Sequence, residues 1–150
     1  MNIRIATDSD LDVLNSFQDK LVIFERPFDV TIKKTRVRYY SIKRYLRSEK
    51  CVVYVVEDGG KAIGCGLGEL KKEEGWSIND YIGYIGLLFI EDGYRGKGYG
   101  KELVQKLTDW FKEKKVTDVR LKVYAQNSKA IEAYEKMGFL HLISEMKISV

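Results

Sequence analysis

The sequence contains few of the residues that bind metals, form disulfides or supply thiol nucleophiles. Among 150 residues there are two cysteines, Cys51 and Cys65, and one histidine, His141. The cysteines do not form a CxxC motif, and one histidine gives few ligands for zinc and no obvious partner for a catalytic thiol. We therefore expect no metal, no disulfide framework and no Cys/His catalytic pair, and we expect both cysteines to be core thiols.

Prolines and long apolar runs are also scarce. Pro27 is the only proline, and no linker or repeat divides the chain. No apolar run approaches the roughly 18 residues of a membrane span, and the N-terminal residues 1–10 do not resemble a signal peptide. A chain of this length suits one domain and can bury about 70% of its unfolded surface. We expect a single domain over residues 1–150 of a soluble, cytoplasmic protein with no membrane partner.

The charge is modest overall but unevenly distributed. The net charge is +4, which by itself does not imply a nucleic-acid partner. Residues 31–50 carry eight basic residues and one acidic residue, so this segment holds +7 and the rest of the chain −3. Tyr39, Tyr40 and Tyr45 lie among these charges, as base-stacking residues of a nucleic-acid-binding domain would. An amphipathic helix with a solvated basic face is the favoured explanation, and a nucleic-acid partner is not expected.

Hydrophobic periodicity and turn residues predict the order of elements along the chain. Strands are predicted at 2–6, 51–57, 62–70, 80–90 and 119–124, with one or two more within 139–150. Helices are predicted from about residue 8 to 24, at 31–47, at 98–114 and from Asn127 to Gly138, and residues 71–79 read as a polar loop. This order predicts an α/β (α+β) fold in which about four helices flank a mixed central sheet of about six or seven strands.

The most informative stretch is the junction of strand, glycine-rich loop and amphipathic helix at residues 87–101. Such a junction presents free backbone N–H groups and the positive end of a helix to an anion. Basic side chains at Arg95, Lys97 and Lys101 add charged donors. The stretch therefore predicts a binding site for a phosphate or pyrophosphate. The Walker spacing fails because no Ser or Thr follows either Gly-Lys pair, and GxGxxG fails because residue 101 is lysine.

Two motifs in this half of the chain resemble those of the GNAT superfamily of N-acetyltransferases. Arg95, Gly98 and Gly100 match its Arg/Gln-x-x-Gly-x-Gly/Ala signature, and residues 127–139 match its Asn-x-x-Ala-x-x-x-Tyr-x-x-x-Gly-Phe pattern. The resemblance is closest over residues 80–140. It implies the GNAT fold and an enzyme that transfers acetyl from acetyl-CoA to a primary amine of a small molecule or protein by direct attack. The alternative is a non-catalytic module that binds acyl-CoA.

The resemblance also implies roles for individual residues. Tyr134 would protonate the leaving thiolate. The expected acetyl-CoA-binding residues are Leu88, Phe89, Ile90, Arg95, Gly96, Lys97, Gly98, Tyr99, Gly100, Lys101, Asn127, Ala130 and Tyr134. The base for the acceptor amine stays unassigned, because residues 81–90 contain no carboxylate, and Glu69, Asp80 and Glu91 are its candidates.

Two further expectations concern partners. The apolar C-terminal stretch 139–150 predicts an edge strand that a second copy would cover, and hence a homodimer. In GNAT proteins the first two helices wall the acceptor side of the site, so the basic segment predicts an acidic or zwitterionic amine as acceptor.

Overall fold

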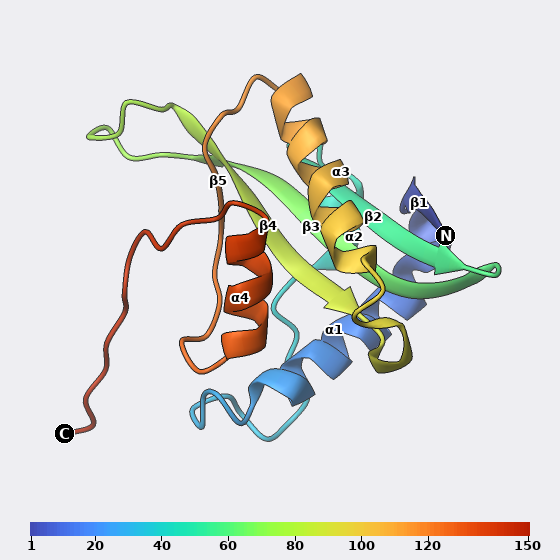
Figure 1. Ribbon diagram of the computed structural model, residues 1–150, viewed down its shortest axis with the longest axis horizontal. Coiled ribbons are helices and arrows are strands. Elements are labelled where there is room, and N and C mark those ends of the chain that lie inside the picture. Colours follow the sequence, from blue (N-terminus) through green and yellow to red (C-terminus); the bar gives the residue numbers. More distant parts are fainter.

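The computed structural model describes residues 1–150, and its strands form one twisted sheet in the order β1-β2-β3-β4-β5 (Figure 1). The pairs β1–β2, β2–β3 and β3–β4 are antiparallel, and the pair β4–β5 is parallel. The mixed sheet is as predicted, but it has five strands and the expected six or seven is wrong. The strands are β1 (Asn2–Ile5), β2 (Cys51–Asp58), β3 (Lys61–Lys72), β4 (Tyr81–Ile90) and β5 (Val119–Leu121).

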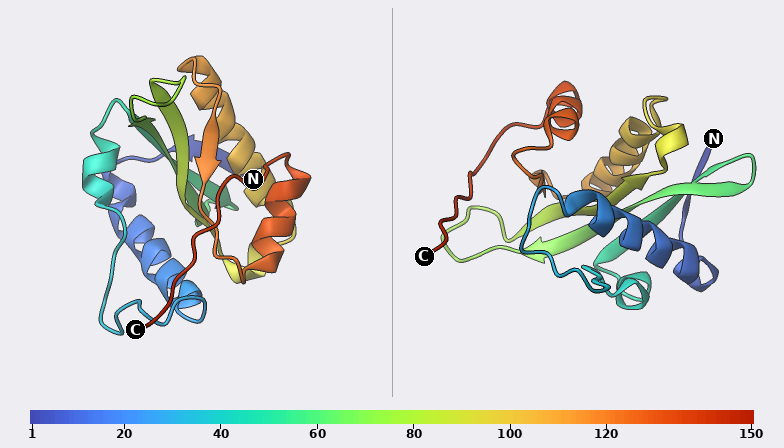
Figure 2. Two further views of the ribbon diagram at one scale, coloured as in Figure 1. Left: turned by 90° about the vertical axis from the view of Figure 1, so that its left-hand side faces the viewer. Right: turned by 90° about the horizontal axis from the view of Figure 1, so that it is seen from below.

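Helices cover both faces of this sheet (Figure 2). On one face lie α1 (Leu11–Glu25) and α2 (Ile42–Leu46), and on the other lies α3 (Tyr99–Glu113). The last helix, α4 (Ser128–Lys136), follows β5, and short 3-10 turns precede α1 and α3. No helix of the protein is both long and apolar enough to cross a membrane.

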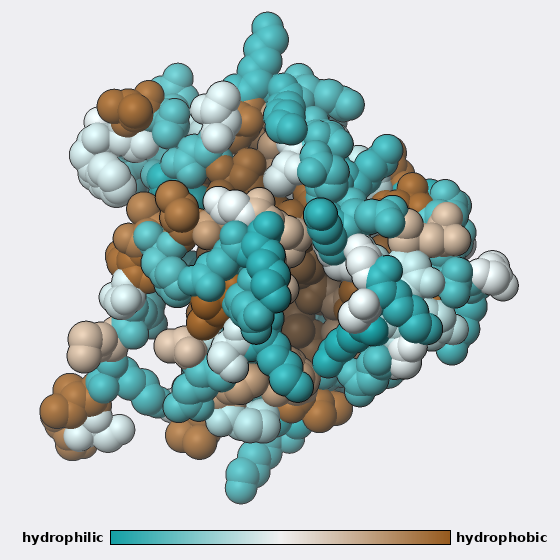
Figure 3. Space-filling model, in the orientation of Figure 1, coloured by the Kyte–Doolittle hydropathy of each residue, from teal (hydrophilic) through white to brown (hydrophobic).

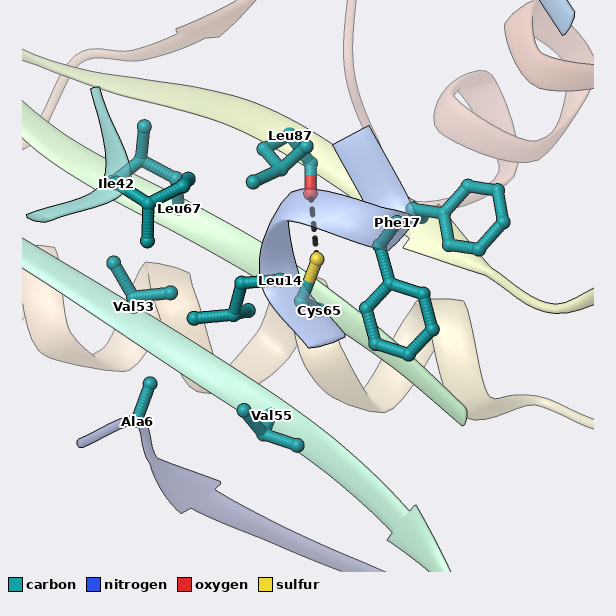
Figure 4. Close-up of a cluster of buried hydrophobic side chains, with 10 residues drawn as sticks. Ala6, Leu14, Phe17, Ile42, Val53, Val55, Cys65, Leu67 and Leu87 are labelled. Atoms are coloured by element: carbon teal, nitrogen blue, oxygen red, sulfur yellow. Dashed lines mark hydrogen bonds between the residues drawn. The ribbon is translucent and has the colours of Figure 1, made fainter. Parts of the chain in front are cut away.

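The alternation of side chains along the strands divides the core into two clusters. In β2, Val53 and Val55 face α1, while Val52 and Val56 face α3. The first cluster contains Leu14, Phe17 and Ile42 from the helices (Figure 4). Cys65 is fully buried there, where the pKa of its thiol is raised by burial, so it serves as a core residue.

Several local predictions are confirmed. The hairpin between β2 and β3 turns at Gly59 and Gly60, both with positive φ. Helix α3 begins one residue after Gly98. The side chain of Asn127 caps α4 by accepting a hydrogen bond from the Ala130 N–H at 3.3 Å, and Gly138 ends this helix with φ +94°.

The predicted basic helix over residues 31–47 is wrong, since only Ile42–Leu46 is helical. Side chains of the first helix region hold the rest of this segment in an irregular path. Arg26 donates hydrogen bonds to the carbonyl groups of residues 33, 34 and 35. Asp19 binds both Arg36 and Arg38. Arg26 thereby occupies carbonyl groups that would accept intrahelical hydrogen bonds if the segment were one continuous helix. Asp19 likewise holds the two arginines in positions that differ from those in such a helix.

Two strand predictions at the other end of the chain are also corrected. Strand β5 ends at Leu121 rather than at residue 124, because β4 and β5 separate beyond that point. The predicted strands within 139–150 do not form in the single chain, because this stretch has no ladder hydrogen bonds to another strand. Strand β3 extends to Lys72, two residues into the predicted loop.

Candidate functional site

A β-bulge in the middle of β4 shapes the centre of the site. Leu87 has φ +45°, and the register between β3 and β4 shifts beside it. Gly86 and Leu87 both face the α1 side, because a Cβ on Gly86 would lie 2.6 Å from the Tyr40 hydroxyl oxygen and Leu87 belongs to the α1 cluster. Glycine is required at position 86 because the Tyr40 ring fills the space of a side chain. The Cys65 thiol donates to the Leu87 carbonyl at 3.6 Å (Figure 4).

Beyond the bulge, the edge of β4 that faces β5 is unpaired. The two strands pair only from Gly83 to Ile85 on β4. The Glu91 N–H donates to the Ile63 carbonyl of β3 at 2.9 Å, so the backbone groups of Leu88 and Ile90 point to the opposite edge. This open edge can receive an extended ligand as an added strand.

The glycine-rich loop beside this edge carries six consecutive free N–H groups. No carbonyl or side chain of the protein accepts a hydrogen bond from the N–H groups of residues 96–101. Gly96 and Gly98 adopt φ +76° and +88°, which turn the backbone into the first turn of α3. The arrangement offers the donors that an anion-binding site of backbone amides and a helix N-terminus requires. Its members are the predicted residues Gly96, Lys97, Gly98, Tyr99, Gly100 and Lys101.

The structure places Arg95 apart from these donors. Its backbone N–H donates to Asp92. Its guanidinium donates to the Ile90 carbonyl at 2.8 Å, pairs with Asp92 at 2.9 Å and lies over the rings of Phe24 and Phe89. Arg95 thereby fixes the loop to the end of β4 and to α1. Lys97 and Lys101 are exposed, and Lys97 lies over the Tyr94 ring.

The second motif supplies the residues beyond the end of β5. The Asn127 cap orients α4, whose Ala130 and Tyr134 are partly buried. The Tyr134 ring packs edge-on against Phe139 at 5.9 Å between centroids. Burial, followed by the negative charge of Glu25, raises the pKa of Tyr134 to about 12. Its hydroxyl therefore keeps its proton at neutral pH.

Glu25 is a candidate site residue that the sequence did not reveal. It is the last residue of α1, and it lies close enough to Tyr134 and Tyr124 for its charge to raise both of their pKa values. Burial raises the pKa of the Glu25 carboxyl, and a hydrogen bond from Tyr39 partly opposes this shift. Phe28 stacks on Tyr124 at 5.9 Å and so joins the end of α1 to the end of β5. No sequence motif marks Glu25, because its partners lie far along the chain.

The carboxylates considered from sequence lie elsewhere or are already paired. Glu91 forms an ion pair with Lys20, and Glu69 lies 3.9 Å from Lys71. Asp80 is in the exposed loop before β4, where its carbonyl accepts from the Glu73 N–H. No group of three or more His, Cys, Asp or Glu residues is placed to hold a metal ion.

Two of the three tyrosines of the basic segment, Tyr40 and Tyr45, pack against the core, whereas Tyr39 is exposed. Tyr40 is partly buried at the bulge, and the Gln18 side chain binds its backbone N–H and carbonyl groups. Tyr45 packs edge-on against the Tyr40 ring at 5.9 Å. Both rings belong to the boundary of the core.

Sequence comparison matches residues 18–139 to the acetyltransferase (GNAT) family. A Methanocaldococcus jannaschii relative, an uncharacterized N-acetyltransferase, is 29% identical over 145 residues, which cover 91% of this chain and 59% of the relative. The N-alpha-acetyltransferase 30 of Saccharomyces cerevisiae is 38% identical over 60 residues, covering 40% of this chain and 34% of the relative. The chain thus spans less than two thirds of the length of these curated relatives.

Solved structures share the fold over the whole chain. A tetramutant of the BH1408 protein of Bacillus halodurans superposes with a TM-score of 0.86 at 21% identity, covering 100% of both chains. A predicted acetyltransferase of Clostridium acetobutylicum, solved with acetyl-CoA, gives a TM-score of 0.79 at 19% identity, covering 99% of this chain and 95% of the other. At these identities the likeness shows the fold.

Proposed function

The chain belongs to the acetyltransferase (GNAT) family, and we propose that it transfers the acetyl group of acetyl-CoA to a primary amine by direct attack. The observation that carries this proposal is the run of six free N–H groups beside the unpaired edge of β4. The run suits a pyrophosphate, and the open edge suits the amide-containing arm that follows it in CoA. A module that only binds acyl-CoA is the alternative.

Each element of the site then has one task in binding. The amides of residues 96–101 would bind the pyrophosphate, and Arg95 would position their loop through its bond to Ile90. The Ile90 carbonyl already accepts a hydrogen bond from Arg95. The backbone N–H and carbonyl groups of Leu88 are therefore the groups on this edge of β4 that are available to the ligand. Asn127 and Ala130 would line the other side of the CoA arm, and Phe89 would support the edge from the core, where it stacks on Phe17.

Tyr134 fits the role of general acid toward the leaving thiolate. A general acid must hold its proton until the thioester breaks, and a phenol does so at neutral pH. Burial raises the pKa of Tyr134 to about 12, which makes it a weaker acid, so the transfer would be driven by the charge that develops on the sulfur in the transition state. The tetrahedral carbon would then lose the CoA sulfur as a thiol, with the phenolic proton transferred to the sulfur. The nearby aromatic ring of Phe139 limits the positions that the phenol can adopt.

We assign the role of general base to Glu25. A primary amine with a pKa near 10.4 is almost fully protonated at pH 7, so it must lose a proton before it attacks. The raised pKa of Glu25 brings this carboxylate closer to the pKa that suits proton transfer at neutral pH. The effect of its charge on the pKa of Tyr134 supports a base and an acid that lie close together. Tyr39, whose hydroxyl opposes the effect of burial on the pKa of Glu25, would orient the carboxylate.

The surroundings favour an acceptor with negative charge beside its amine. Arg36 and Arg38 are paired with Asp19, but Lys33 and Lys34 are exposed and have no carboxylate partner. These lysines lie in the segment that Arg26 ties to the end of α1, close in sequence to Glu25. One relative acts, by its name, on α-amino groups and another on streptothricin. We propose an acidic or zwitterionic amine, or an acidic protein N-terminus, over polyamines.

The test is acetyl transfer measured by thiol release from acetyl-CoA, with acceptors that differ only in charge. We expect an acidic N-terminal peptide to be a better substrate by kcat/KM at low salt than a lysine-rich peptide or spermidine. The Glu25→Gln variant should lower kcat at least tenfold while acetyl-CoA affinity is unchanged, and Glu113→Gln, an exposed carboxylate on α3, is its control. Binding of acetyl-CoA without turnover of any amine would favour the binding module, and a preference for spermidine would refute the acceptor assignment.

A further inference from the structure

One stripe of side chains on α1 faces the end of β4 and the loop that follows it. Phe17, Lys20 and Phe24 are spaced three and four residues apart, so they lie on one face of the helix. The Phe17 ring stacks on the Phe89 ring at 5.3 Å between centroids. Lys20 forms an ion pair with Glu91. The first two side chains of the stripe therefore bind α1 to the end of β4.

The third side chain of the stripe, Phe24, has its partner in the glycine-rich loop. The guanidinium carbon of Arg95 lies 5.1 Å from the centre of the Phe24 ring, an attractive contact between a cation and an aromatic face. The position of the guanidinium is fixed from its other side. Its Nε donates to the Ile90 carbonyl at 2.8 Å, and its Nη1 pairs with Asp92 at 2.9 Å. These contacts direct the arginine side chain toward α1.

The last turn of α1 is weakly anchored by burial. Only Val22 is fully buried there, and Ile23 and Phe24 are 61% and 40% exposed. Glu25 follows Phe24 directly and is the last residue of the helix. Its hydrogen-bond partner, Tyr39, lies in the irregular segment after α1. A contact that fixes Phe24 therefore also limits the positions that Glu25 can adopt.

We propose that Arg95 is a positioning residue for the acceptor side of the site, because by holding Phe24 it fixes the last turn of α1 and so the carboxylate of Glu25. The arginine of the glycine-rich motif would then support deprotonation of the amine, while the backbone amides of residues 96–101 bind the pyrophosphate. The inference rests on the proposed role of Glu25 as base. A displacement of about 1 Å at a reacting group can cost about a hundredfold in rate, so one contact at the end of a helix is enough to matter.

The contact between Arg95 and Phe24 joins the two sides of the candidate site. A hollow with hydrophobic side chains at its floor opens between α3 and α4, over the second half of β4 (Figure 3). Helix α1 runs past the end of β4 on the other face of the sheet (Figure 1). Phe24 also packs edge-on against Phe28 at 5.6 Å, and Phe28 stacks on Tyr124 beyond β5. A continuous row of contacts thus leads from the glycine-rich loop to the aromatic residues around Glu25.

The first test is kinetic and compares Arg95→Gln with Lys106→Gln. Glutamine keeps an N–H donor for the Ile90 carbonyl but removes the cation over Phe24. Lys106 is exposed on α3 and controls for the loss of one positive charge. We expect Arg95→Gln to lower kcat/KM for the amine at least tenfold at pH 7, while its dissociation constant for acetyl-CoA, measured by calorimetry, changes less than threefold. Lys106→Gln should change neither quantity more than twofold.

The pH dependence of this loss separates a role in deprotonation from a general structural role. The loss should shrink as the pH approaches the pKa of the amine, because a neutral amine needs no base. The phenols that interact with Glu25 all have raised pKa values and keep their protons over this range; they are Tyr39, Tyr84, Tyr124 and Tyr134. A loss of equal size from pH 7 to pH 9.5 would overturn the proposal.

A double-mutant cycle tests whether Arg95 acts through Phe24. Phe24→Leu should reproduce the loss in kcat/KM of Arg95→Gln. The double variant should lose no more than twofold beyond the larger single loss, since both substitutions remove the same contact. Losses that multiply in the double variant would show that the two residues act independently, and would overturn the proposal.

Hydrogen exchange of the unliganded protein tests the same contact without catalysis. The amides in the last turn of α1 should exchange at least threefold faster in Arg95→Gln than in the unaltered protein or in Lys106→Gln. Unchanged exchange there, or a tenfold loss of acetyl-CoA affinity with kcat retained, would overturn the proposal. Faster exchange together with full turnover by Glu25→Gln would refute the proposed base and support the hold of Arg95 on α1.

Discussion

Gly100 separates what the glycine-rich loop does for folding from what it does for binding. It is the second residue of α3, its φ is not positive, and a Cβ placed on it would meet no atom within 4 Å. Valine and glycine differ by about 0.5 kcal/mol or less in helix propensity, so Gly100→Val should leave the free energy of unfolding nearly unchanged. The midpoint of thermal unfolding should then move by less than about 3 °C.

Binding of acetyl-CoA should respond very differently to the same substitution. The valine side chain would extend into the open space beside the free N–H groups of residues 96–101. If it keeps the phosphate from even one of these donors, the loss is a hydrogen bond to a charged group, worth about 1.5–3 kcal/mol. That range corresponds to a decrease in affinity of about tenfold to about a hundredfold.

Titration calorimetry with acetyl-CoA, beside thermal unfolding, measures both quantities. Gly93→Val is the matched control, because Gly93 lies in the preceding turn, has open space around it and contributes none of the six free N–H groups. Lys97→Ala should reduce affinity much less than Gly100→Val, since its exposed ammonium is solvated. Affinity of Gly100→Val within threefold of the unaltered protein, or equal losses for all three variants, would show that the backbone amides do not bind the ligand.

Three further predictions test the acid, the N-terminal ion pair and the core. Tyr134→Phe should lower kcat about 10- to 1000-fold with acetyl-CoA affinity unchanged, as expected for a general acid, and unchanged turnover in steady-state kinetics would make Tyr134 a core residue only. Hydrogen bonds from Arg4 lower the pKa of Asp10 to about 2. The contribution of this carboxylate to the free energy of unfolding should therefore be complete above pH 4, and roughly 2 kcal/mol should be lost as the pH drops through 2. Denaturant titrations should show this pH dependence in the unaltered protein and not in Asp10→Asn. Gly83→Ala should destabilise by about 1–3 kcal/mol because its Cβ would lie 2.7 Å from the buried Phe111 ring, and Phe111→Leu should partly restore the unfolding midpoint if that clash is the cause.

The sequence by itself determined the features that depend on neighbours in the chain. The turn at Gly59 and Gly60, the Asn127 cap and the Gly138 helix end were predictable, because each is set by the backbone preferences and hydrogen bonds of a few adjacent residues. The amphipathic pattern of α3 and the glycine-rich loop before it were visible for the same reason. The family motifs then identified the two halves of the candidate site.

Only the tertiary structure decided the features that depend on distant segments. The basic segment does not form one long helix, because Arg26 and Asp19 bind its backbone and side chains from another element. Strand β5 pairs with β4 only from Gly83 to Ile85, before the bulge at Leu87, and the Tyr40 ring from a distant part of the sequence fills the space beside Gly86 at that bulge. Glu25 became a candidate base because α1 brings its last turn to Tyr124 and Tyr134, about a hundred residues further along the chain. Periodicity cannot report such contacts, since burial and electrostatic coupling depend on distances in space rather than on spacing in sequence.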